Sequence, residues 1–136
     1  MVALLDSVMV AGFLDRDDAF HPAADGRIRE LAGRHSLVVS VITYADVLTG
    51  AGRGHHAQDA VRGFFRDLVD DVHGVDRAIA ERAAALRSTK RSLRMPDALI
   101  LATAEVRNAD CVITGDRSWT NVDIGPAIEL LRPTGG

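Results

Sequence analysis

The sequence is poor in cysteine, lysine and aromatic residues, and it has no long apolar run. Cys111 is the only cysteine, so an internal disulfide is excluded and a cytoplasmic, reducing location is expected. Its position in the apolar run CVIT favours a packed small hydrophobe. No run approaches the ~20 apolar residues of a membrane-spanning helix, so we expect no contact with a membrane. The N-terminus MVALLDS lacks the basic region and apolar stretch of a signal peptide.

The charge balance is not that of a strongly basic nucleic-acid-binding platform. The net charge is −3, although acids clustered at one site can hide a local basic rim. Lys90 is the only lysine among 16 basic residues. Arginine suits bidentate contacts with phosphate, but so strong a bias also fits the base composition of a genome. Aromatic residues make up 4% of the chain, which gives little support for the stacking of unpaired bases.

The length of 136 residues and the hydrophobic fraction of 47% indicate one α/β domain, residues 1–136, with its own core. Short apolar runs alternate with segments of helical periodicity, which predicts a parallel sheet covered on both faces. The expected strands are residues 2–5, 37–41, 71–75, 110–114 and 128–131. The expected helices are residues 8–14, 22–34, 44–49, 57–69, 76–87 and 96–108. Thr43 is expected to cap the third helix, and the segment AGRGHH to form a flexible loop.

Four aspartates stand where such a sheet would bring ligands together. Asp6 and Asp116 follow apolar runs, whereas Asp46 and Asp97 lie near the starts of predicted helices. Ligands of open parallel sheets bind outside the carboxyl ends of the strands. Four carboxylates meeting there need a counter-charge, and hard cations such as Mg²⁺ or Mn²⁺ take oxygen ligands and work with phosphate substrates. The sequence therefore points to metal-dependent chemistry on a phosphodiester.

Each of these acids also has a local explanation. Asp6 can cap the helix that follows it, and Asp46 stands three residues after Thr43, as in a capping box. Asp97 in a first helical turn is favoured by the helix dipole, and Asp116 in TGDRSW suits a turn. A shared site explains all four positions at once, so we favour it.

The blocks LLDSVMV, SVITYADVLTG, RMPDALILATA and VITGDRSW follow one another between about residue 2 and residue 119. Together they resemble the PIN-domain fold and, more narrowly, the VapC-type toxins of bacterial toxin–antitoxin pairs. The resemblance implies a three-layer α/β/α domain with a short, mainly parallel central sheet. It also implies an Mg²⁺- or Mn²⁺-dependent endoribonuclease that forms a homodimer and is held inactive by a cognate antitoxin.

Carried over by motif, the resemblance implies that Asp6, Asp46, Asp97 and Asp116 are the catalytic residues. Asp6, Asp97 and Asp116 match the acids of the family and are the expected metal ligands. Asp46 stands where the family usually has glutamate. Because its side chain is one methylene shorter, whether it reaches the metal directly or through a water is left open.

Neighbours of these acids have expected supporting roles. Ser7 and Thr114 lie beside two acids and are expected to hold carboxylates or waters by hydrogen bonds. Trp119 occupies a position where the family usually has phenylalanine, and we interpret it as packing. Contacts with the RNA backbone are expected from basic residues near the site, for which a solvated face is the alternative. These residues are Arg87, Lys90, Arg91, Arg94 and Arg117.

Other functions stay open on the sequence. A phosphoacceptor receiver domain is disfavoured, because it has two adjacent acids after its first strand and this chain has only Asp6 there. A catalytically silent PIN-like module that binds an antitoxin or RNA is kept as the main alternative because of Asp46. The acids also do not distinguish RNA from DNA as the substrate. The five histidines show no zinc-binding pattern and are expected at the surface or in loops.

Overall fold

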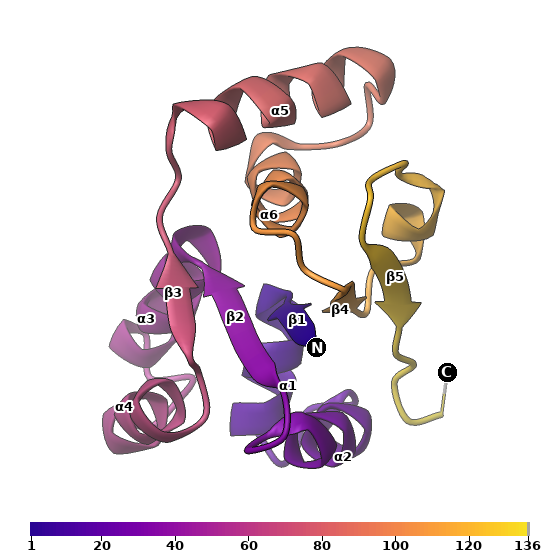
Figure 1. Ribbon diagram of the computed structural model, residues 1–136. Helices are drawn as coiled ribbons and strands as arrows, with labels where there is room; N and C mark the ends of the chain where they lie inside the picture. The colour runs from indigo at the N-terminus through magenta and orange to yellow at the C-terminus, as the bar shows by residue number, and fades with distance from the viewer. Residues whose placement is uncertain (136) are drawn as a thin grey trace.

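The computed structural model describes residues 1–135 and shows a five-stranded sheet between two layers of helices (Figure 1). The strands are β1 (Val2–Leu5), β2 (Ser36–Ser40), β3 (Asp71–His73), β4 (Cys111–Thr114) and β5 (Ala127–Leu130). Their order is β3-β2-β1-β4-β5, and every neighbouring pair is parallel. The predicted α/β/α architecture is confirmed, with a sheet that is wholly rather than mainly parallel.

Six α-helices and a short 3₁₀ helix connect the strands of the described chain. They are α1 (Ser7–Leu14), α2 (His21–Leu31), α3 (Val41–Gly52), α4 (Gln58–Asp67), α5 (Arg77–Thr89), α6 (Met95–Val106) and the 3₁₀ helix η1 (Arg117–Asn121). In Figure 1, α5 and α6 lie on one side of the sheet and α2 and α4 on the other. Between residues 1 and 135, no helix is long and apolar enough to cross a membrane.

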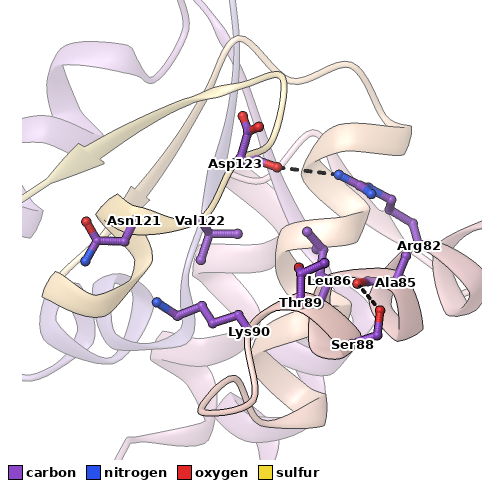
Figure 2. A pocket seen from close by; sticks show the side chains of 9 residues that line it. All are labelled: Arg82, Ala85, Leu86, Ser88, Thr89, Lys90, Asn121, Val122 and Asp123. Carbon is purple, nitrogen blue, oxygen red and sulfur yellow. Dashed lines mark hydrogen bonds between the residues drawn. The ribbon is translucent and has the colours of Figure 1, made fainter.

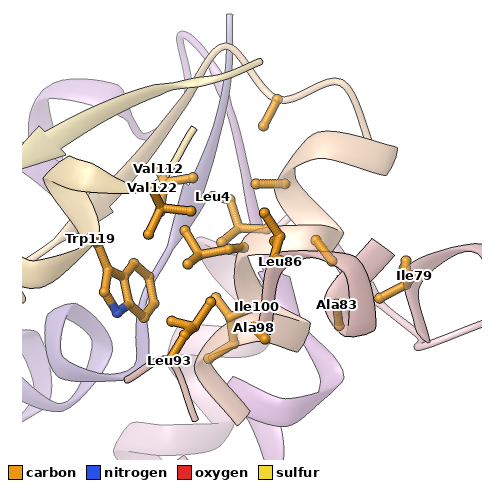
Figure 3. Packing of buried hydrophobic residues seen from close by; sticks show 14 of the residues in the cluster. Leu4, Ile79, Ala83, Leu86, Leu93, Ala98, Ile100, Val112, Trp119 and Val122 are labelled. Carbon is orange, nitrogen blue, oxygen red and sulfur yellow. The ribbon is translucent and has the colours of Figure 1, made fainter. Parts of the chain in front are cut away.

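The side chains of β1 alternate between two hydrophobic cores. Leu4 packs with residues of α5 and α6 and with Val112 of β4, and Figure 3 shows this cluster together with Trp119. Ala3 and Leu5 face the other core, which α1 to α4 complete. A strand that is buried on both faces has no polar side to expose, which explains why these strands are continuous apolar runs in the sequence.

The largest error in the predicted boundaries concerns α3. Its N-cap is Ser40, whose side chain accepts a hydrogen bond from the backbone N–H of Ile42. The helix therefore begins at Val41, before the predicted start, and it ends at Gly52. The prediction that Thr43 caps this helix is wrong, and so is the capping-box explanation of Asp46. The 3₁₀ helix η1 was not predicted, because only its turn residues and no apolar period mark it.

Candidate active site

The four predicted acids line one cavity of about 300 Å³ at the carboxyl ends of the central strands. Asp6 directly follows β1, and Asp116 lies two residues beyond β4. Asp97 belongs to the first turn of α6, whereas Asp46 lies within α3. The structure therefore brings together side chains that are up to 110 positions apart in the chain (from Asp6 to Asp116).

Asp6 is the most buried of these acids. Its side chain is the N-cap of α1, where Oδ1 accepts a hydrogen bond of 2.6 Å from the backbone N–H of Ser7. Its second oxygen, Oδ2, accepts a hydrogen bond of 2.8 Å from the hydroxyl of Thr114. Burial raises the pKa of Asp6 from 3.8 to about 6, against the two hydrogen bonds and with a further contribution from the charges of Asp97 and Asp116. The capping explanation and the shared-site explanation thus both describe this residue.

Thr114 connects two of the acids through one buried hydroxyl. Besides donating to Asp6, its Oγ1 accepts a hydrogen bond of 3.0 Å from the backbone N–H of Asp116. This arrangement fixes the end of β4 relative to the end of β1 at the point where both carboxylates enter the cavity. The predicted contact of Thr114 with an acid is therefore present in the structure.

Asp97 has an environment that disfavours its charge. Burial raises the pKa of its carboxyl, and the negative charges of Asp116 and Asp46 raise it further. The guanidinium of Arg94 acts in the opposite direction. Arg94 is also the only basic residue among the described residues that line this cavity. The cavity therefore has a clear excess of negative charge.

Asp46 is exposed, and its carboxylate accepts a hydrogen bond from a residue of another helix. The hydroxyl of Ser7 in α1 donates a hydrogen bond of 2.9 Å to Oδ2 of Asp46. The same hydroxyl lies 3.2 Å from Oγ1 of Thr43, which is fully buried in α3. Ser7 was predicted to support an acid, whereas sequence reasoning missed this role of Thr43. The signal was available, because Thr43 and Asp46 are three residues apart and share one face of a helix.

Asp116 is the N-cap of η1. Its Oδ1 accepts hydrogen bonds from the backbone N–H of Ser118, at 2.9 Å, and from the Ser118 hydroxyl, at 2.7 Å. The predicted turn role is therefore present alongside the position at the cavity. Trp119 follows in the same 3₁₀ helix and is 1% exposed, which confirms that it packs in the core. Its indole ring also lines the acidic cavity, which the sequence did not indicate.

The donor set fits a hard divalent cation in its chemistry. Four carboxylates meet at one cavity; burial raises the pKa of both Asp6 and Asp97, and repulsion between the acids raises it further. A cation would relieve that repulsion, and oxygen is the ligand type that Mg²⁺ and Mn²⁺ prefer. As the side chains are oriented, however, no three acid, imidazole or thiolate groups of residues 1–135 stand close enough to hold a metal ion together. Asp6, Asp46 and Asp116 are each turned towards a local donor instead.

Of the five predicted RNA-binding residues, only Arg94 lines this cavity. Lys90 donates a hydrogen bond of 3.2 Å to the carbonyl of Ser118, close to Asp116. Arg87 donates to the carbonyl of Leu93. Arg91 and Arg117 are exposed. Their contact with RNA stays a prediction.

A second hollow, of about 530 Å³, lies beside Lys90, one of the predicted RNA-binding residues (Figure 2). It is formed by the C-terminal half of α5 and residues 121–123. Arg82 and Lys90 both line it, but Arg82 forms an ion pair with Glu105 of α6 and donates to the carbonyl of Asp123. Arg82 therefore has its charge already compensated within the fold.

Comparison with known proteins gives a family match and several similar structures. Residues 3–125 match the PIN domain family. A toxin–antitoxin complex from Klebsiella pneumoniae is 26% identical with a TM-score of 0.71, over 93% of this chain and 95% of that chain. VapBC2 from Rickettsia felis, solved with a promoter DNA fragment, is 15% identical with a TM-score of 0.78, over 96% and 99%.

A third similar structure is that of Mycobacterium tuberculosis VapC20, described as a sarcin–ricin loop cleaving toxin. It is 18% identical with a TM-score of 0.71, over 89% of this chain and 96% of that chain. The comparison with curated proteins gives no match. The resemblance deduced from the four sequence blocks is confirmed, because the family match spans all four of them. The chain belongs to the PIN domain family.

Proposed function

We propose that the protein is an Mg²⁺- or Mn²⁺-dependent endoribonuclease and that it acts as the toxin of a toxin–antitoxin pair. The observation that carries this proposal is the convergence of Asp6, Asp46, Asp97 and Asp116 on one cavity. Membership of the PIN domain family supports a nuclease. The similarity to toxin–antitoxin structures supports the biological role.

Three of the four acids are assigned to metal binding. Asp6, Asp97 and Asp116 would hold the divalent cation, after the side chains of Asp6 and Asp116 turn from their present donors towards the cavity. When bound, the cation supplies charge neutralisation at the phosphate and lowers the pKa of water. Because the pKa of Asp6 is about 6, this carboxyl is mostly ionised at pH 7 and competent to bind a cation.

Asp46 is assigned to the positioning of the attacking water. It is the exposed member of the set, and the hydroxyl of Ser7 restrains its carboxylate. Attack in line with the P–O3′ bond breaks that bond, which leaves a 3′-hydroxyl on one fragment and a 5′-phosphate on the other. Arg94 would contact a phosphate at the edge of the cavity, and Arg87, Lys90, Arg91 and Arg117 would contact the flanking backbone.

The partners and the cellular location of the protein are inferred from its proposed role as a toxin. A cognate antitoxin is expected, since the Klebsiella pneumoniae and Rickettsia felis structures are toxin–antitoxin assemblies. We also expect a homodimer in the cytoplasm.

A catalytically silent module that binds RNA or an antitoxin is the second candidate. The observation in its favour is that Asp46 is shorter than the usual glutamate and is drawn towards Ser7. Both candidate functions use the same acidic cavity, so only a test for RNA cleavage distinguishes them.

The experiment is incubation of the purified protein with a mixed pool of structured RNAs. Reactions contain Mg²⁺, Mn²⁺ or excess EDTA, and Asp97→Asn is prepared identically. We expect cleavage that EDTA and Asp97→Asn both abolish, with 5′-phosphate ends. Cleavage that survives both would contradict the proposed mechanism, and binding of RNA without any cleavage would favour the silent module.

A further inference from the structure

A small hollow of about 170 Å³ adjoins the acidic cavity. It is lined by Ser7, Val8, Ala11, Asp46, Val47 and His56, and is called the His56 hollow below. Ser7, Val8 and Asp46 also line the acidic cavity, so the two spaces are adjacent and share these residues as a common wall. Two chemical groups that are linked by a few covalent bonds in one molecule could therefore occupy the His56 hollow and the acidic cavity at the same time.

The walls of the His56 hollow are mainly apolar. Val8 is 39% exposed although it is a large hydrophobic residue, and Ala11 and Val47 complete the same wall. The polar groups that reach the hollow come from Ser7, Asp46 and His56. An apolar wall with a few polar groups at its edge suits a flat, uncharged heterocycle. It does not suit a phosphate, because Asp46 would repel it.

The imidazole of His56 packs against α3 at Gly50, where the helix has no side chain. A Cβ atom on Gly50 would lie 2.9 Å from Cδ2 and 3.0 Å from Nε2 of His56. The Nδ1 atom of His56 is buried and has no hydrogen-bond partner in the part of the chain that the structure describes. The sequence placed this residue in a flexible loop, yet the ring is packed against a helix beside the acids. Imidazole is one of the side-chain rings on which unpaired bases stack in protein–RNA complexes.

We propose that the His56 hollow binds one unpaired nucleobase of the RNA next to the scissile phosphate, with the imidazole of His56 as the stacking surface. This inference rests on the proposed nuclease function, which supplies the RNA, and it deepens that function by assigning a specificity-determining residue. The base is uncharged, so the negative cavity does not oppose its binding. His56 thereby provides the aromatic surface that the low aromatic content of the sequence did not predict.

The first test uses uncharged nucleosides and needs no cleavage. The full-length protein in EDTA is titrated with adenosine, guanosine, cytidine and uridine, and the methyl NMR signals of Val8, Ala11 and Val47 are followed. At least one nucleoside is expected to shift these signals. His56→Ala should weaken its binding about tenfold, the scale of one base stacked on a ring. His56→Phe keeps a flat ring and should largely restore binding.

His55→Ala is the matched control, because His55 is the adjacent histidine but does not line the hollow. It should bind nucleosides as the wild type does. The proposal is overturned if no nucleoside shifts these methyl signals, if the shifts centre on the hollow beside Lys90, or if His55→Ala weakens binding as much as His56→Ala.

The second test maps the cut sites of wild type and His56→Ala in the same RNA pool. We expect the base preference next to the cut to relax by about tenfold in His56→Ala, while metal-dependent cutting persists. An unchanged preference would count against the proposal. The two tests distinguish the nuclease function from base binding in the His56 hollow. Nucleoside binding without any RNA cleavage would contradict the nuclease function and support the base-binding site. RNA cleavage without nucleoside binding would support the nuclease function and contradict the base-binding site.

Discussion

Replacement of Asp6 by asparagine is expected to stabilise the metal-free protein, although Asp6 is assigned to the active site. The pKa of Asp6 is raised from 3.8 to about 6, mainly by burial. A difference of roughly two units corresponds to ~3 kcal/mol of folding free energy, at about 1.4 kcal/mol per unit. This free energy opposes folding when the buried carboxyl is ionised.

The direction of the pH dependence follows from proton binding. Because the folded state binds the proton more tightly than the unfolded state, stability is highest at low pH and falls as the pH rises from about 4 through 6. The side chain introduced by Asp6→Asn does not ionise, so the advantage of this variant over the wild type should grow over this interval and level off above about pH 7. The new amide can donate to the Thr114 hydroxyl and accept from the backbone of Ser7, which preserves both local contacts in altered form.

The assay is thermal unfolding followed by circular dichroism in EDTA between pH 4.5 and 8. At roughly 3 °C per kcal/mol for a domain of this size, Asp6→Asn should raise Tm by several degrees at pH 8, up to about 9 °C. The difference should shrink towards pH 4.5. Mg²⁺ added in excess over the EDTA should then raise the Tm of the wild type but not that of Asp6→Asn. A lower Tm for Asp6→Asn at pH 8, with no dependence on pH, would refute the argument.

Three other substitutions test the supports of the site. Thr114→Val removes the hydroxyl that joins Asp6 to the backbone of Asp116, so it should lower the free energy of unfolding in urea by ~1–3 kcal/mol and abolish RNA cleavage. An unchanged urea midpoint would contradict this role of Thr114. Gly115→Ala places a Cβ 2.6 Å from the ring of Phe20 and should destabilise the protein by ~1–3 kcal/mol; a wild-type Tm would show that the ring moves aside freely. Asp46→Glu restores the usual length of this acid and should increase metal-dependent cleavage at unchanged Tm, since Asp46 is exposed; reduced cleavage would show that the site is adapted to aspartate.

The sequence predicted the architecture because the strands are apolar on both faces. Residues such as Ala3, Leu4 and Leu5 alternate between two cores, so continuous apolar runs are the direct consequence of the three layers. The start of α3 was harder to predict, because Ser40 and Thr43 are both acceptable caps and the sequence does not show that the helix begins directly at the end of β2.

The acids of the site were found from their places after apolar runs or near the starts of predicted helices, whereas the residues that support them were found only in part. Ser7 and Thr114 are sequence neighbours of acids, so their contacts could be anticipated. The contact of Thr43 with Ser7, and the positions of Trp119 and His56 at the two cavities, depend on contacts between distant segments. Nothing local in AGRGHH indicates that one of its histidines packs against α3, since the space at Gly50 exists only in the folded helix.

The most direct test of the central claim is the binding of Mn²⁺, measured by electron paramagnetic resonance at pH 7.5. We predict that the wild type binds Mn²⁺ and that Asp97→Asn weakens binding at least about tenfold, because the loss of a ligand should cost at least as much as the loss of a group that supports one. Asp59→Asn is the matched control, because Asp59 also lies in the first turn of a helix but is exposed and away from the acidic cavity. Equal binding by the wild type and Asp97→Asn, or equal weakening by Asp59→Asn, would contradict the claim that these acids form one metal site.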